Sequence, residues 1–431
     1  MKNTSGRDAV LRAIEDARDE MVAFAQDLIR IPTVNPPGDC YEPCAQLLGA
    51  ALARDGFHVE YVTAVDRPEH SARFPRVNVV GRKGAAARPC IHLNGHIDVV
   101  PVGEGWSHDP FAGTVEDGRL YGRGASDMKG GIAAARFAVE GIRRAGIPLA
   151  GTVEISGTVD EESGGWAGVA HLAAAGRLTS DHVDQVVIPE PLGVDQVCIG
   201  HRGVYWFELT TKGRIAHGSM PFLGVSAIEH MGEVLHHMRA ALGPALARRI
   251  TAMPVIPAGA RQATLNVNSV WGGQPVHGMQ TPCVADRCTA VFDRRFLVEE
   301  SVSDVKREVQ DVLNEIRQRL PAFDCDLREL MLVHPVATPT DSPLVASLAR
   351  AIGTVRGTPA GLVASPGTYD HKHVTRIGGI VNCVAYGPGR LELSHQPDEW
   401  CDISEMVQAA QVMALGILDV VGPYELRGTE A

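Results

Sequence analysis

Residues 91–100 read Ile-His-Leu-Asn-Gly-His-Ile-Asp-Val-Val, an apolar run that carries His96 and Asp98 near its end. A short apolar run of this kind is typical of a strand buried inside a sheet. Side chains two residues apart on a strand face the same way, so we expect His96 and Asp98 to lie together. Ligands bind at the carboxyl edge of parallel sheets, which makes this pair a candidate site. The structural alternative is a histidine that only completes hydrogen bonds at a strand end.

Other short apolar runs alternate with helical patterns on both sides of this stretch. The strand-like runs lie at 77–80, 152–159, 186–188 and 380–386, and helical spacing occurs at about 10–28, 131–144, 166–175 and 403–418. Strands separated by helices require crossover connections, which favour a parallel sheet covered on both faces. The sequence therefore predicts an α/β fold, with a mostly parallel-sheet catalytic domain that has helices on both faces.

Residues 206–320 have a different pattern. Apolar and polar residues alternate at 207–212, 263–270 and 288–297, as in strands with one face in water, and helical spacing occurs at 226–242 and 302–320. These elements form a compact α+β unit. We therefore expect an inserted α+β domain at 206–320, within a catalytic domain made of residues 1–205 and 321–431.

Composition excludes several classes of protein. The 431 residues carry a formal charge of −11 and no dense run of Lys and Arg, so nucleic acid is not an expected partner. No apolar stretch approaches the roughly 18 residues that a membrane-spanning helix needs, and the N-terminus lacks the apolar core of a signal peptide. The nine cysteines include no CxxC pair, which fits reduced thiols. These features predict a soluble, cytoplasmic protein with no membrane partner.

Carboxylates and a second histidine follow the neighbouring elements. Asp127 lies in a Gly-rich loop before a helix, 160–162 is Asp-Glu-Glu after a strand, and Glu190 and His395 follow two further strands. Each has a structural alternative: a helix cap, a solvated acidic loop, or a turn residue. Together, two imidazoles and three carboxylates suit two zinc-like ions and hydrolysis by a metal-bound hydroxide. Glu161 is then a spare carboxylate beside a ligand.

A set of motifs covers nearly the whole chain. They are Gly95-His-Ile-Asp-Val-Val-Pro101, Trp106 with Asp109-Pro-Phe111, Tyr121-Gly-Arg-Gly through Gly131, Asp160-Glu-Glu-Ser-Gly164, Glu190-Pro191, Ala216-His-Gly-Ser219 and His395. In content and order they resemble the acetylornithine deacetylase, succinyl-diaminopimelate desuccinylase and carboxypeptidase G family of dinuclear zinc amidohydrolases. The resemblance implies two divalent ions per subunit, zinc first, with cobalt or manganese where those are more available.

The resemblance also implies a role for each residue of the site. His96 and Glu190 would hold one ion, Glu162 and His395 the other, Asp127 would bridge them, and Asp98 would orient His96. Glu161 would be the general base, which takes a proton from the water and delivers it to the leaving amine.

The same resemblance implies that the inserted domain is a lid that also forms the dimer. His217 would donate to the oxyanion in the partner subunit of a homodimer, and Arg295 would bind a substrate carboxylate through its guanidinium group. Two segments depart from the family pattern. The turn after Gly272-Gly273 is longer than in the family and lacks the usual Asn. Near the C-terminus the family usually has an arginine that contacts the substrate, and this chain has Lys372 or His371 in its place. We expect Lys372 to make that substrate contact.

The expected activity is hydrolysis of the amide of a small N-acyl amino acid, as in deacetylases and desuccinylases. A dipeptidase or carboxypeptidase-like metallopeptidase is the alternative among enzymes. A catalytically silent dimeric binding protein is the alternative of another class. The contacts that select the acyl group and the amine lie in the two segments that depart from the family pattern.

Overall fold

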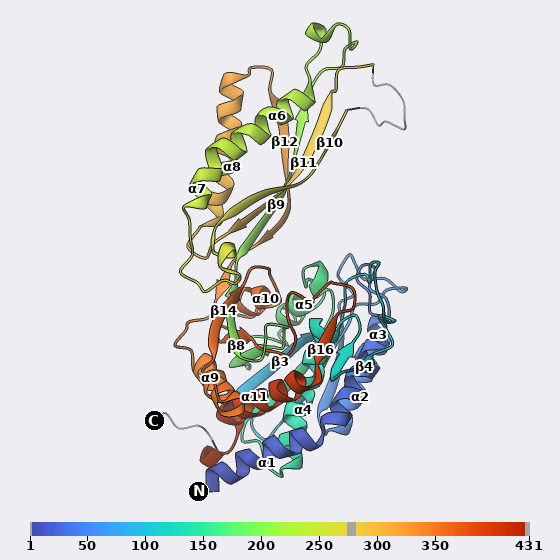
Figure 1. The fold of residues 1–431 in the computed structure, drawn as a ribbon, viewed down its shortest axis with the longest axis vertical. Helices are drawn as coiled ribbons and strands as arrows, with labels where there is room; N and C mark the ends of the chain where they lie inside the picture. Colours follow the sequence, from blue (N-terminus) through green and yellow to red (C-terminus); the bar gives the residue numbers. More distant parts are fainter. Residues whose placement is uncertain (1, 274–281, 427–431) are drawn as a thin grey trace. The chain divides into compact units, whose positions relative to one another are not determined.

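The strand that ends at His96, β3 (Cys90–His96), lies inside a nine-stranded sheet (Figure 1). The computed structural model describes residues 2–273 and 282–426. The chain divides into two compact units. The first contains residues 1–200, 338–363 and 369–431, and the second contains residues 201–337 and 364–368.

The centre of the large sheet is parallel, and its sides are antiparallel. The order is β1-β2-β6-β3-β7-β15-β8-β13, with β14 beside β8. Strands β6, β3, β7 and β15 run parallel to one another, whereas β1 is antiparallel to β2, β2 to β6, and β8 to β15. The bounds are β1 (His58–Thr63), β2 (Val77–Gly84), β6 (Thr152–Thr158), β7 (Gln185–Ile188), β8 (Gln196–His201), β13 (Val336–Ala337), β14 (Gly361–Ser365) and β15 (Cys383–Ala385).

The first unit also holds most of the helices and a small second sheet. The helices are α1 (Lys2–Asp16), α2 (Arg18–Ile29), α3 (Tyr41–Arg54), α4 (Gly130–Arg144), α5 (Val169–Ala174), α9 (Pro343–Arg356), α10 (His371–Arg376) and α11 (Ile403–Val421). The expected single opening helix is therefore two helices, which separate at Ala17. The small sheet has the order β16-β5-β4, with β4 (Thr114–Glu116), β5 (Arg119–Tyr121) and β16 (Trp400–Asp402).

The two faces of β3 differ in chemistry. One face packs against α4, where a Cβ on Gly95 would lie 2.5 Å from Ile132 Cγ1, so glycine allows the helix to approach closely. The other face is polar, because alternate residues of a strand face the same side. It carries His92, Asn94 and His96, in register with Glu154, Ser156 and Thr158 of β6. The polar face leads directly to the carboxyl edge where His96 stands.

The expectation that no apolar stretch is long enough to span a membrane is wrong for helix α11. By length and composition Ile403–Val421 is long and apolar enough to cross a membrane, whereas no such stretch was expected. In the structure 67% of this apolar stretch is buried, and α11 packs against α4 and α9. Side chains such as Met406 and Leu415 lie in the hydrophobic core. We therefore interpret α11 as the central core helix of the first unit.

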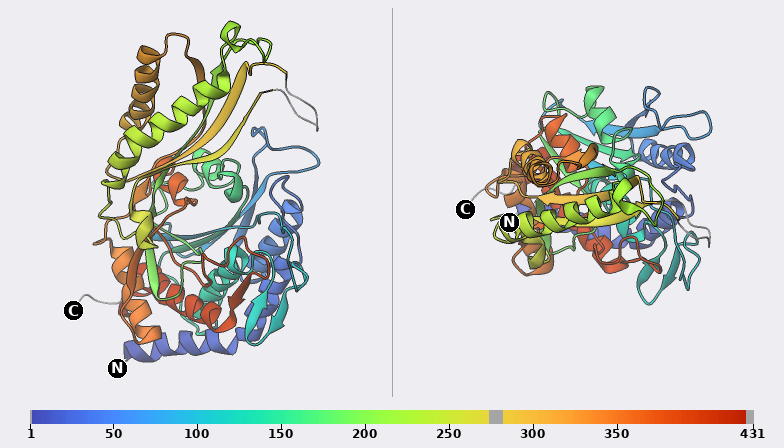
Figure 2. Two further views of the ribbon diagram at one scale, coloured as in Figure 1. Left: turned by 45° about the horizontal axis from the view of Figure 1, so that its top comes forward. Right: turned by 90° about the horizontal axis from the view of Figure 1, so that it is seen from above.

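The second unit is a four-stranded antiparallel sheet with helices on one face, coloured from green through yellow to orange in Figure 2. The strand order is β10-β11-β9-β12, with β9 (Gly203–Lys212), β10 (Thr264–Gly272), β11 (Arg287–Phe296) and β12 (Asp324–Val333). The helices are α6 (Ala227–His237), α7 (Gly243–Ala247) and α8 (Val302–Arg319).

The observed limits of this unit differ from the expected 206–320. Strand β9 begins before residue 206, and β12, beyond residue 320, pairs with β9 along its length. The apolar residues at 330–333 give β12 the appearance of a buried strand of the catalytic domain, although the strand completes the smaller sheet. Residues 274–281, which contain most of the long turn after Gly272-Gly273, lie outside the described residues.

Candidate metal centre

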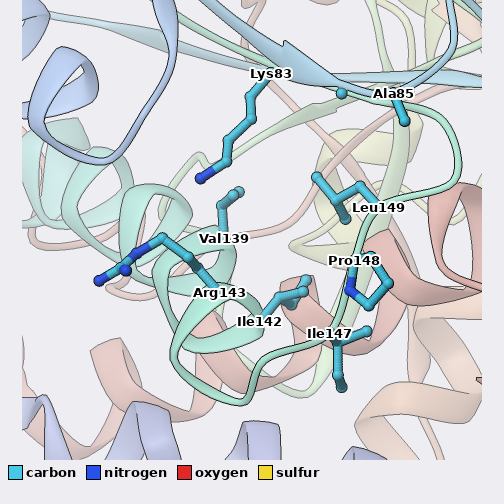
Figure 3. A pocket seen from close by; sticks show the side chains of 9 residues that line it. Lys83, Ala85, Val139, Ile142, Arg143, Ile147, Pro148 and Leu149 are labelled. Carbon is cyan, nitrogen blue, oxygen red and sulfur yellow. The ribbon is translucent and has the colours of Figure 1, made fainter.

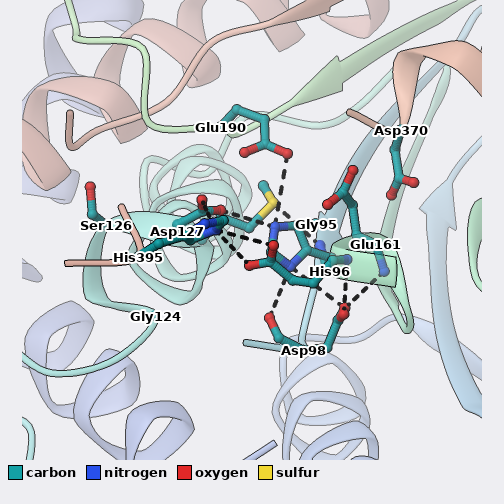
Figure 4. Close-up of polar contacts among 12 residues, drawn as sticks. Gly95, His96, Asp98, Gly124, Ser126, Asp127, Glu161, Glu190, Asp370 and His395 are labelled. Carbon is teal, nitrogen blue, oxygen red and sulfur yellow. Dashed lines mark hydrogen bonds and ion pairs between the residues drawn. The ribbon is translucent and has the colours of Figure 1, made fainter. Parts of the chain in front are cut away.

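Five side chains expected to hold metal come together at the carboxyl edge of the parallel strands. Figure 4 labels His96, Asp127, Glu190 and His395 among them. His96 ends β3, Glu162 follows β6, and Glu190 follows β7. Asp127 lies in a kinked π-helical turn, Ala125–Lys129, directly before α4, and His395 lies between β15 and β16. Three of them, His96, Asp127 and Glu162, each offer a ligand atom within 4.8 Å of the others. The topology thus gathers residues that are far apart in the sequence.

Asp127 lies between the two histidines. Its Oδ1 is 3.1 Å from His96 Nε2, and its Oδ2 is 3.6 Å from His395 Nε2. Glu190 Oε1 lies 3.9 Å from the same nitrogen of His96, and Glu162 Oε2 lies 3.1 Å from that of His395. The five residues therefore form two imidazole–carboxylate pairs, with Asp127 shared between them.

The convergence of carboxylates perturbs their protonation. Burial, reinforced by the charge of Asp127, raises the pKa of Glu162 to about 7 and that of Glu190 well above its usual value. Burial also acts to raise the pKa of Asp127, but hydrogen bonds from His395 and His96 hold it below its usual value. Hydrogen bonds to Asp127 and Glu162 raise the pKa of His395 to about 10. Such a site attracts positive charge, and its nitrogen and oxygen donors suit a zinc-like ion.

Asp98 supports the site mainly through the backbone of its neighbours. Its carboxylate accepts hydrogen bonds from the backbone N–H groups of Glu161 at 3.2 Å and Glu162 at 3.1 Å, and from Asn35 Nδ2 at 2.9 Å. His96 Nδ1 lies 3.0 Å from the backbone oxygen of Asp98 and 3.6 Å from its carboxylate. Burial raises the pKa of Asp98 to about 6. The closer contact to His96 is therefore the main-chain carbonyl.

The three consecutive carboxylates after β6 have three different positive partners. Asp160 turns away from the metal centre and pairs with buried Arg76 at 2.9 Å. Glu161 Oε1 lies 3.3 Å from the ammonium nitrogen of Lys372, and Glu162 meets His395. These partners separate the three neighbouring charges, and only Glu162 belongs to the group around Asp127. Asp160 itself has a left-handed backbone, with φ at 59°, and its carboxylate also accepts a hydrogen bond from the Tyr41 hydroxyl at 2.8 Å.

Glu399 supports the Asp127 loop and was not anticipated from the sequence. Its buried carboxylate accepts hydrogen bonds from the backbone N–H groups of Gly124, Ser126 and Asp127 at 2.9 to 3.1 Å, and it pairs with Arg123 at 2.6 Å. The sequence offers only a weak signal for this contact: Glu399 lies close to His395, and the Gly-rich loop contains Arg123. Asp127 itself is not a helix cap, because α4 begins at Gly130 and has no side-chain cap.

The remaining expected site residues are divided between the two units. Lys372 lies in the first unit, beside Glu161, whereas His217 and Arg295 lie in the second. Arg295 makes two hydrogen bonds to Asp293, at 2.8 and 3.1 Å. His217 is exposed, and its Nδ1 accepts a hydrogen bond from the backbone N–H of Ser219 at 3.1 Å. Because Nδ1 accepts, a neutral His217 carries its hydrogen on Nε2.

A separate pocket of about 280 Å³ in the first unit has a different lining (Figure 3). Lys83 and Arg143 flank apolar side chains that include Val139, Ile142 and Leu149. Its lining contains no imidazole or carboxylate. This pocket therefore offers no metal ligand or carboxylate base for hydrolysis, and the carboxylate-rich sheet edge remains the candidate site.

Comparisons with known proteins agree with the motifs. A model of peptidase family M20/M25/M40 matches residues 92–419. A succinyl-diaminopimelate desuccinylase of Methylobacterium radiotolerans is 29% identical over 94% of this chain and 98% of its own length. The N-formyl-4-amino-5-aminomethyl-2-methylpyrimidine deformylase of Bacillus subtilis is 29% identical over 93% and 95%.

A solved structure has the same fold at lower sequence identity. The YxeP protein of Bacillus subtilis, described as a dinuclear metal binding peptidase from the M20 family, is similar with a TM-score of 0.66. It is 17% identical, and the match covers 94% of this chain and 98% of that one. At this sequence identity the similarity shows a shared fold and nothing further.

Proposed function

Because the chain belongs to peptidase family M20/M25/M40, we propose that it hydrolyses the amide bond of an N-acyl amino acid. The family membership confirms the resemblance drawn from the motifs, and it makes the chain a metal-dependent hydrolase of amide bonds. The observation that carries the proposal is the position of Asp127 between two imidazole–carboxylate pairs. The named relatives, a desuccinylase and a deformylase, favour removal of an acyl group from an amine.

The five converging side chains fit two divalent ions. His96 and Glu190 would hold one ion, His395 and Glu162 the other, and Asp127 would bridge them. The fit rests on the donor set and on buried carboxylates that a cation would keep ionised. When bound, two such ions polarise a carbonyl group and lower the pKa of water. We propose zinc, with cobalt or manganese as replacements, because availability as well as affinity selects the ion.

The protein's own groups supply the proton transfers and the binding contacts. The Glu161 carboxylate takes a proton from the attacking water and later delivers it to the leaving amine nitrogen. The hydrogen on His217 Nε2 is free to be donated to a developing oxyanion in a partner subunit. Arg295 would bind a substrate carboxylate with the guanidinium edge that now faces Asp293.

The second unit has a surface suited to self-association as a lid and dimerisation domain. Strand β10 is the edge of its sheet, and edge strands present unpaired backbone groups to partners. Exposed apolar side chains stand on or beside that edge, with Val270 at 48%, Trp271 at 52% and Ile228 on α6 at 50%. We propose that this surface forms the homodimer.

All nine cysteines lie among the described residues and none forms a disulfide bond, which supports a cytoplasmic location.

Metal content provides one test. Protein purified without chelator should contain two divalent ions per subunit, and Asp127→Ala should lose metal because both proposed sites share that carboxylate. Elemental analysis measures both, with His58→Ala, an exposed histidine on β1, as the control that keeps its metal. A content near zero after metal supplementation, or an Asp127→Ala variant that retains two ions, would contradict the proposed centre.

A substrate panel tests the activity itself. We expect higher kcat/KM for N-acetyl, N-succinyl or N-formyl amino acids than for dipeptides, measured on the metal-loaded protein. A preference for dipeptides or C-terminal residues of peptides would instead support the metallopeptidase alternative. Failure to hydrolyse any member, with both metal ions present, would support the catalytically silent binding protein.

A further inference from the structure

Lys372 lies in the first turn of α10, buried beside the proposed base. Its ammonium nitrogen is 3.3 Å from Glu161 Oε1, and the two side chains are 5% and 10% exposed. Burying an ammonium group is costly unless an opposite charge accompanies it. The Glu161 carboxylate is the opposite charge that the structure places in contact with it.

The start of α10 is anchored to the strands that lead to the metal centre. Asp370, directly before the helix, accepts a hydrogen bond from Asn94 Nδ2 of β3 at 3.1 Å, and it lies 3.5 Å from Thr158 Oγ1 of β6. Its other oxygen, Oδ1, is buried, and no hydrogen-bond partner for it lies among the residues that the structure describes. Burial and the nearby charge of Glu161 raise the pKa of Asp370 to about 7 (Figure 4). The polar face of the sheet thus fixes the backbone from which Lys372 extends.

We propose that Lys372 is a positioning residue for Glu161, and not the contact for a substrate carboxylate that the family pattern suggests. The inference rests on the proposed function, because it assigns Glu161 as the base. The ion pair engages Oε1 and orients the carboxylate, which leaves Oε2 to take the proton from water and return it to the amine nitrogen. A buried charged pair of this kind is strongly disturbed when one partner is removed.

The neighbouring His371 does not share this role. Its Nδ1 lies 3.3 Å from the Tyr369 hydroxyl, and its Nε2 lies 3.4 Å from Thr338 Oγ1. Burial lowers the pKa of His371 to about 3, so the ring is neutral in this environment. Of the two residues that could replace the usual arginine, only Lys372 brings a positive charge to Glu161.

Steady-state kinetics of Lys372→Met test the proposal. We expect kcat to fall by about 10- to 100-fold, as for other residues that orient a catalytic group, while KM stays within about twofold. The loss should be equal for an N-acyl amino acid and for its carboxamide, which lacks the substrate carboxylate. Lys83→Met, which removes another lysine away from the metal centre, is the matched control and should leave both constants unchanged. Elemental analysis should find the same metal content in all three proteins.

A double-mutant cycle with Glu161→Gln separates positioning from substrate binding. If Lys372 acts through Glu161, adding Lys372→Met to Glu161→Gln causes no further loss of kcat. A rise in KM confined to the carboxylate substrate, an additive loss in the double variant, or no loss at all would overturn the proposal. If Lys372→Met does not fold, Lys372→Arg is measured in its place. Arginine keeps the positive charge but holds it in a different geometry, so the proposal requires a change in kcat and not in KM. A wild-type protein inactive on every substrate would instead contradict the proposed function.

Discussion

Glu161→Gln is expected to lower kcat by roughly 10²- to 10⁴-fold while the protein keeps its metal, because a positioned general base contributes about this much. The amide has nearly the same shape as the carboxylate, but it cannot accept the proton of the attacking water. Glu161 is not one of the five side chains that meet around Asp127, and its backbone N–H remains bound to Asp98. The loss should therefore appear in turnover, measured at saturating substrate beside elemental analysis of the same sample.

The control for this prediction is Glu15→Gln, the same change at an exposed position of α1. It should retain wild-type turnover, metal content and thermal unfolding temperature. A Glu161→Gln protein that loses its metal would mean that Glu161 is a ligand. A loss of less than about tenfold would mean that another group accepts the proton.

The candidate ligands were predictable because each follows an element that the sequence marks clearly. His96, Glu162 and Glu190 come directly after buried strands, and parallel strands place their carboxyl ends at one edge. The alternation of strands and helices likewise predicts the parallel centre of the sheet. Asp127 is different, because an Asp in a Gly-rich loop before a helix favours a helix cap, and its role in the site is implied only by the resemblance of the motifs.

The supporting residues were not predictable, because their partners are distant in the sequence and often belong to the backbone. Glu399 binds main-chain N–H groups more than 270 residues away, and Asp370 binds Asn94 from a similar separation. No spacing rule connects such positions. The expectation that Lys372 contacts the substrate comes from analogy with an arginine, and no sequence pattern shows that its ammonium group lies beside Glu161. The expected end of the second unit at residue 320 differs from the structure because β12 pairs with β9, a strand distant in the sequence.

His217→Ala is expected to lower kcat by roughly 10²- to 10³-fold without loss of metal, which corresponds to about 2.7–4 kcal/mol for one oxyanion donor. The hydrogen bond from the Ser219 backbone N–H to Nδ1 selects the tautomer whose hydrogen is on Nε2. That hydrogen is then available to a substrate oxygen. Kinetics and elemental analysis of the variant, with His58→Ala as the exposed-histidine control, test this prediction.

Subunit mixing tests whether His217 serves the partner's site. In a dimer of Glu161→Gln and His217→Ala protomers, one of the two sites would contain both an intact Glu161 and the partner subunit's His217. Random exchange makes half of the dimers mixed, so the mixture should recover about a quarter of wild-type turnover although each parent is inactive. Labelled subunits verify the exchange. If the exchanged mixture remains as inactive as its parents, His217 does not act across the dimer, and the proposed lid role of the second unit fails with it.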